Sequence, residues 1–123
     1  DITALLKFHR EHKKFCTVTS VQPSGRFGAI NLNENDQVSS FAEKPRGDGA
    51  WINGGFFVCE PDIFEYIDGD ATLWEKEPME KLAADGQMMA YRHQGYWKPM
   101  DTLRDKAELE KEWLTGHAPW KKW

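Results

Sequence analysis

The spacing of apolar and polar residues predicts a chain in which helices and strands alternate. Apolar positions at Ala4, Leu5, Leu6 and Phe8 precede a charged stretch, which predicts a helix over residues 3–13. Runs rich in β-branched and aromatic residues predict strands at 15–21, 26–32, 37–43, 51–59 and 88–93. Further helices are expected at 62–67, 74–84 and 102–114.

Signals at the ends of these segments sharpen the pattern. The first helix should be capped by Asp1 or Thr3, and Pro61 suits the first position of the second. The third should begin properly near Glu77 and have Gly86 as its C-cap. A polar cluster at residues 33–36 joins two strands as a β-hairpin. Strands that alternate with helices then predict an α/β sheet with an inserted hairpin.

Composition narrows the class of protein. With 123 residues, 40% hydrophobic and 29% charged, the chain is expected to fold as one domain over residues 1–123. A net charge of −4 gives no general attraction for nucleic acid or an anionic membrane, so neither is an expected partner. The six Trp should fill a core, line a sugar-stacking surface or cover an interface.

The two cysteines do not form a redox or zinc motif. Cys16 and Cys59 lie inside apolar runs and are expected to be buried free thiols, with no C-x-x-C spacing. There is also no apolar stretch of membrane-spanning length. These features predict a cytoplasmic address.

The first candidate for chemistry is Glu43-Lys44-Pro45, at the end of a predicted strand. Pro45 ends the strand's hydrogen bonding and releases the charged pair at the edge of the sheet. Glu43 can accept hydrogen bonds from sugar hydroxyls, and Lys44 can oppose a phosphate as a point charge. The alternative is an ordinary solvated charge pair.

The second candidate is Asn53-Gly54-Gly55, inside an apolar strand. Two glycines there lose side-chain packing, which a closely approaching ligand or a β-bulge would explain equally well. The amide of Asn53 offers a sugar both a donor and an acceptor.

The third candidate is Asp101, at the junction of an aromatic stretch and the last helix. Its carboxylate could cap that helix or bind Mg²⁺, since hard cations prefer carboxylate oxygens. His9 and His12 lie three residues apart on the first helix and are expected to be a surface pair. No order of residues typical of a Ser-His-Asp nucleophile is present.

Taken in order, these motifs resemble the C-terminal half of a sugar-phosphate nucleotidyltransferase, and among that family the glucose-1-phosphate cytidylyltransferases. The resemblance extends over the whole chain and is most specific at residues 23–29 (PSGRFGA), 41–50 (FAEKPRGDGA), 52–58 (INGGFFV) and 99–105 (PMDTLRD). It implies a partial Rossmann-like mixed sheet of the nucleotide-diphospho-sugar transferase type. It also implies a reaction of CTP with glucose 1-phosphate that gives CDP-glucose, as used in surface polysaccharide biosynthesis, and pyrophosphate.

The resemblance also implies roles for individual residues. Lys44 would hold the sugar phosphate, and Glu43 a sugar hydroxyl. Asn53 and Gly54 would line the hexose, and Gly28 would let it approach the backbone. Asp101 would be one of two Mg²⁺ ligands, so that Lys44 and Asp101 are the expected catalytic residues.

The family's glycine-rich nucleotide-binding loop and its other metal carboxylate are expected in an N-terminal half outside this chain. One hypothesis is therefore a cytidylyltransferase fragment that is inactive alone. The alternative is a non-catalytic module that binds sugar phosphate or pairs with another chain. Under this alternative the exposed half-sheet must be covered, which predicts a homo-oligomer such as a dimer or a swapped assembly.

Overall fold

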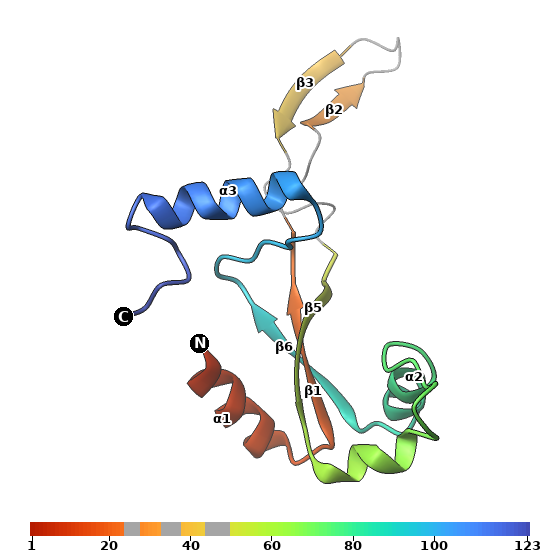
Figure 1. Cartoon of the computed structure of the whole chain (residues 1–123). Coiled ribbons are helices and arrows are strands. Elements are labelled where there is room, and N and C mark those ends of the chain that lie inside the picture. The colour runs from red at the N-terminus through yellow and green to blue at the C-terminus, as the bar shows by residue number, and fades with distance from the viewer. Residues whose placement is uncertain (24–27, 33–37, 44–49) are drawn as a thin grey trace. The chain divides into compact units, whose positions relative to one another are not determined.

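The computed structural model describes residues 1–23, 28–32, 38–43 and 50–123 (Figure 1). The chain divides into two compact units. The first is formed by residues 1–22 and 50–93, and the second by residues 23–49 and 94–123. No helix in the described ranges is long and apolar enough to cross a membrane.

The first unit is built on a three-stranded mixed sheet with the order β5-β1-β6. The central strand β1 (Cys16–Val21) pairs antiparallel with β5 (Ile52–Cys59) and parallel with β6 (Met88–His93). All six residues of β1 are buried, because it has a neighbouring strand on both sides. The predicted mixed α/β fold is confirmed, whereas its Rossmann-like character stays a prediction.

Helix α1 (Ile2–His12) packs against this sheet (Figure 1). Asp1 caps it by accepting a hydrogen bond from the N–H of Ala4 at 3.1 Å, so the first of the two predicted caps is confirmed. Its apolar stripe includes Leu5, which is buried, and Phe8, whose ring lies edge-on to Tyr91 of β6 at 5.5 Å.

Two short helices follow β5. The segment η1 (Pro61–Tyr66) is a 3₁₀ helix with proline in its first turn, and α2 (Glu77–Ala84) begins where the sequence predicts. The C-cap of α2 is Asp85 rather than Gly86. Gly86 is the next residue and has the left-handed φ of 67° that closes such a helix end.

The second unit contains the predicted hairpin and the last helix. Strands β2 (Gly28–Leu32) and β3 (Val38–Glu43) pair antiparallel, with Gly28 directly opposite Glu43. Helix α3 (Leu103–Leu114) starts with a capping box. After it the chain turns back, and Trp120 lies 5.6 Å from the ring of Tyr96.

Candidate functional site

Strand β5 carries a bulge at the predicted Asn53-Gly54-Gly55 site. The pairing with β1 shifts register between Val18 and Ser20, so extra residues of β5 lie opposite one residue of β1. The side-chain oxygen of Asn53 accepts a hydrogen bond from the N–H of Gly55 at 2.8 Å. Gly55 has a φ of 84°, which favours glycine.

Gly54 is required by packing against the neighbouring strand. A Cβ at this buried position would lie 2.9 Å from the carbonyl oxygen of Thr19 and 3.1 Å from Cγ1 of Val21. Of the two explanations for the glycines, the structure therefore shows the bulge. Contact of Asn53 and Gly54 with a sugar stays a prediction, and Asn53 is exposed enough to make it.

The hairpin brings two predicted substrate-binding residues together. Gly28 and Glu43 are Cα partners at the open end of β2 and β3. Because one residue of this pair is glycine, the backbone of β2 is bare of side chain beside Glu43. Lys44 lies outside the described residues.

Asp101 precedes helix α3 but does not cap it. The N-cap is Thr102, whose hydroxyl accepts from the N–H of Asp105 at 3.1 Å, while Asp105 accepts from the N–H of Thr102 at 3.1 Å. The capping interpretation of Asp101 is therefore wrong. Hydrogen bonding by the Thr102 side chain, and then by the N–H of Asp101, lowers the pKa of Asp105.

The carboxylate of Asp101 is exposed and has no hydrogen bond or ion pair with any residue that the structure describes. Such a group suits a hard cation such as Mg²⁺ in its donor chemistry. Within the described ranges, however, no cluster of three His, Cys, Asp or Glu side chains could hold a metal. Asp101 can thus supply one ligand, and a complete metal site needs others.

Charges beside Asp101 are already paired. Glu108 of α3 forms ion pairs with Lys98 and with Arg104, the latter at 3.1 Å. Lys98 and then Arg104 lower the pKa of Glu108 through their hydrogen bonds. The segment before α3 is therefore fastened to the first turns of the helix, which fixes the backbone around Asp101.

Sequence reasoning missed a hydrogen-bonded chain under α1. His9, expected at the surface, is only 3% exposed. Its Nδ1 lies 2.8 Å from the hydroxyl of Thr17, and its Nε2 lies 2.8 Å from a carboxylate oxygen of Glu60. The same Thr17 hydroxyl lies 2.5 Å from Nε2 of His12.

The geometry shows which atom donates in each of these hydrogen bonds. Nδ1 of His12 accepts from the N–H of Lys14 at 2.9 Å, so neutral His12 carries its proton on Nε2 and donates to Thr17. Thr17 then donates to His9, and Nε2 of His9 donates to Glu60. These hydrogen bonds connect α1 to β1 and to the residue after β5. We call the four residues the His9 network: His9, His12, Thr17 and Glu60.

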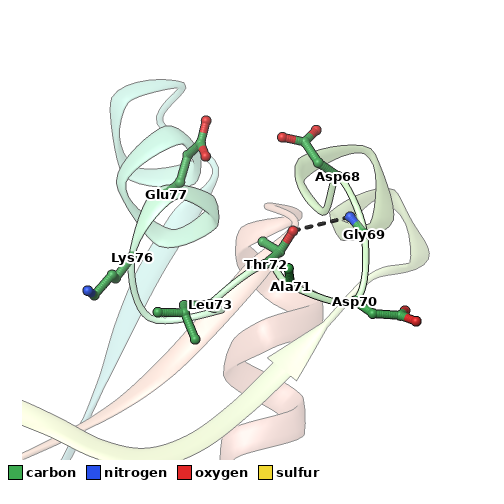
Figure 2. Close-up of a pocket in the computed structure, with 8 residues that line it drawn as sticks. All are labelled: Asp68, Gly69, Asp70, Ala71, Thr72, Leu73, Lys76 and Glu77. Carbon is green, nitrogen blue, oxygen red and sulfur yellow. Dashed lines mark hydrogen bonds between the residues drawn. The ribbon is translucent and has the colours of Figure 1, made fainter.

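An open pocket of about 540 Å³ lies in the loop between η1 and α2. Its lining is drawn in Figure 2, where the hydroxyl of Thr72 accepts from the N–H of Gly69 at 3.2 Å. Asp68, Asp70 and Glu77 give it an acidic rim. None of the sequence-predicted site residues lines this pocket.

The sequence matches a known protein family over most of its length. A family model described as nucleotidyl transferase matches residues 1–113. The glucose-1-phosphate cytidylyltransferase of Salmonella typhimurium (strain LT2) is 55% identical over 123 residues, which is the whole chain and 48% of that protein. A protein of Bacillus subtilis (strain 168) named probable glucose-1-phosphate cytidylyltransferase is 38% identical over 120 residues, 97% of the chain and 46% of the relative.

The fold is also similar to a solved structure. HddC from Yersinia pseudotuberculosis aligns with a TM-score of 0.62 over 92% of this chain and 49% of that one, at 17% identity. The chain spans about half the length of the curated relatives that it matches. The expectation that this half is the C-terminal one is not confirmed by the shared length and stays a prediction.

Proposed function

Because the chain belongs to the nucleotidyl transferase family, we propose that it supplies the sugar-phosphate side of a glucose-1-phosphate cytidylyltransferase. The observation that carries the proposal is the 55% identity to the Salmonella typhimurium enzyme over every residue of this chain. The proposed reaction joins CTP and glucose 1-phosphate to give CDP-glucose and pyrophosphate.

Catalysis would rest on substrate positioning and charge neutralisation, since the reaction transfers a nucleotidyl group directly to the sugar phosphate. Lys44 opposes the phosphate of glucose 1-phosphate, and Glu43 accepts from a hexose hydroxyl. The bare backbone at Gly28, opposite Glu43, leaves room for the sugar to approach. Asn53 and Gly54 line the hexose, with the bulge fixing the direction of the Asn53 amide.

Asp101 would be one ligand of Mg²⁺, and its exposed carboxylate without a partner among the described residues supports this role. A bound Mg²⁺ would neutralise charge on the phosphates. The capping box and the Lys98–Glu108 ion pair hold the backbone on either side of Asp101, so the carboxylate is presented without being consumed by helix capping.

We propose further that the chain does not complete the reaction alone, because its sequence contains no glycine-rich nucleotide-binding loop. The test is to co-express it with each half of the Salmonella typhimurium relative in turn and to measure CDP-glucose and pyrophosphate from CTP and glucose 1-phosphate. Activity should appear with the half that carries a nucleotide loop and be absent for the chain by itself. Turnover by the chain alone, or activity with neither half, would contradict the proposal.

The same assay tests the residue roles. Lys44→Ala should raise KM for glucose 1-phosphate at least about tenfold, because it removes a charge-assisted contact worth roughly 1.5–3 kcal/mol. Asp101→Asn should change the dependence of the rate on Mg²⁺ concentration while leaving the circular dichroism of the chain unaltered. An unchanged Mg²⁺ dependence would remove Asp101 from the metal site.

A further inference from the structure

The two cysteines lie side by side across two strands, although 43 positions separate them in the sequence. Cys16 of β1 and Cys59 of β5 are Cα partners in the antiparallel register. Their sulfur atoms are 3.6 Å apart. Small rotations of the two side chains would bring these atoms to bonding distance.

The backbone hydrogen bonds show which kind of antiparallel pair this is. The N–H of Glu60 donates to the carbonyl of Phe15 at 2.8 Å, so the bond joins the residue after Cys59 to the residue before Cys16. That pattern marks Cys16 and Cys59 as a non-hydrogen-bonded pair, in which Cα atoms lie about 4.5 Å apart and side chains are closest. This spacing falls within the range of about 4.4–6.8 Å that disulfides span.

The two thiols differ in access. Cys16 is fully buried at 0% exposure, whereas Cys59, expected from the sequence to be buried, is exposed because β5 is an edge strand of the described sheet. A reagent in solution therefore reaches Cys59 first. Cys16 can react only with a sulfur already attached to Cys59.

We propose that Cys16 and Cys59 are a modification site that forms a reversible intramolecular disulfide by exchange with a low-molecular-weight disulfide. Cys59 loses its proton to solvent, and its thiolate attacks one sulfur of the external disulfide, which releases one thiol. Cys16 then loses its proton and attacks the sulfur of Cys59, which releases the second thiol. The two cysteines are oxidised by two electrons, and the external disulfide is reduced to two thiols.

The reaction is slow at neutral pH and accelerates in alkali. Burial raises the pKa of Cys16 to about 12. Cys59 is exposed on one side only, and partial desolvation by the neighbouring strand also raises the pKa of its thiol. Since the thiolate is the reacting species, the rate should rise about tenfold for each pH unit as long as both thiols are mainly protonated. The pair therefore responds to sustained rather than brief oxidation.

The new bond would fasten the first residue of β1 to the last residue of β5. It would lie next to Glu60, which accepts the hydrogen bond from His9. Oxidation would thus fix the end of β5 that anchors the His9 network. It would leave the bulge at the other end of the strand in place.

The test uses the reduced chain and oxidised glutathione as the probe, with intact mass and non-reducing peptide mapping over time. The wild type should lose two hydrogen atoms in mass and yield one peptide pair cross-linked through Cys16 and Cys59. Cys16→Ala should stop at a glutathione adduct on Cys59, and Cys59→Ser should take up no glutathione while folded.

Other outcomes would overturn the proposal. These are a lasting glutathione adduct on the wild type, a dimer linked between chains, or no change in mass at pH 8.5 over a day. Dithiothreitol should restore the reduced mass, and failure to do so would exclude a reversible disulfide. Sugar-phosphate binding plays no part in this readout, so the result is independent of the proposed function.

Discussion

Removing the hydroxyl of Thr17 should destabilise the chain far more than removing the same group two residues further along. Thr17→Val keeps the shape of the side chain but deletes the atom shared by His9 and His12. Thr19→Val is the matched control on the same strand. Thr19 is also buried, and its hydroxyl has no hydrogen-bond partner among the residues that the structure describes.

The magnitude follows from the two hydrogen bonds at 2.8 and 2.5 Å. Their net contribution is about 1 kcal/mol each, and leaving Nδ1 of the buried His9 unpaired costs roughly another 1–3 kcal/mol. Burying a methyl group instead of the hydroxyl returns about 1 kcal/mol. Thr17→Val should therefore lower the free energy of unfolding by about 2–4 kcal/mol, and Thr19→Val should leave it unchanged or raise it.

Urea unfolding followed by Trp fluorescence measures the difference. With a slope of about 2 kcal/mol per molar urea, within the usual range for a small domain, the midpoint for Thr17→Val should fall by about 1–2 M. Equal midpoints for the two variants would refute the His9 network as a stabilising element.

The pH dependence of the wild type gives a second readout of the same network. Burial, and then the neighbouring His9, lower the pKa of His12 below its ordinary value of 6.5. The unfolded chain therefore binds this proton more readily than the folded chain. The contribution of neutral His12 to the free energy of unfolding is fully present above pH 6.5 and decreases as the pH falls below it. Urea midpoints should decrease between pH 7 and pH 5.5, and a constant midpoint would contradict the assignment of neutral His12.

The bulge in β5, the N-cap of α3 and the cysteine pair can each be tested by their effect on stability. Gly54→Ala should lower the free energy of unfolding by about 1–3 kcal/mol in a denaturant melt, because the new Cβ would collide with Thr19. Gly69→Ala is the control and should be nearly neutral, because a Cβ there meets open space. Equal effects of the two substitutions would refute the close packing at the bulge. In the same melts, Thr102→Ala should lower the free energy of unfolding by about 1 kcal/mol, because it removes the N-cap of α3, whereas Asp101→Ala should change it very little. The reverse order would show that Asp101 is the cap. The proposed disulfide closes a loop of 43 positions and should raise the free energy of unfolding by about 4 kcal/mol in the chain-entropy model. Thermal melts of the oxidised chain with and without reductant measure this gain. An unchanged Tm would show that strain in the folded state offsets the entropy.

Much of the fold was predictable because its signals are local. The helix capped by Asp1, the pairing of β2 with β3 and the helix at Glu77 are each predicted by caps, turn residues or periodicity in the sequence. The predicted turn at residues 33–36 lies outside the described residues. Asp101 was a misassignment by one position. The Thr102-x-x-Asp105 spacing is itself a capping-box signal that names the correct cap.

The His9 network was not predictable by spacing alone, because its partners are remote. Glu60 lies 51 positions from His9, and only the pairing of β5 with β1 brings it near. One signal was available, since His9 is four residues after Leu5 on the apolar stripe of the first helix, which predicts a buried position. The exposure of Cys59 likewise depends on where β5 lies in the sheet.

Calorimetric titration of the chain with glucose 1-phosphate tests the central claim most directly, with glucose and inorganic phosphate as separate controls. We expect saturable binding of glucose 1-phosphate, with an affinity higher than that for either control. Lys44→Ala should lower this affinity at least about tenfold. Circular dichroism would verify that both proteins are folded. A folded chain that shows no saturation, or a Lys44→Ala variant that binds as well as the wild type, would contradict the account.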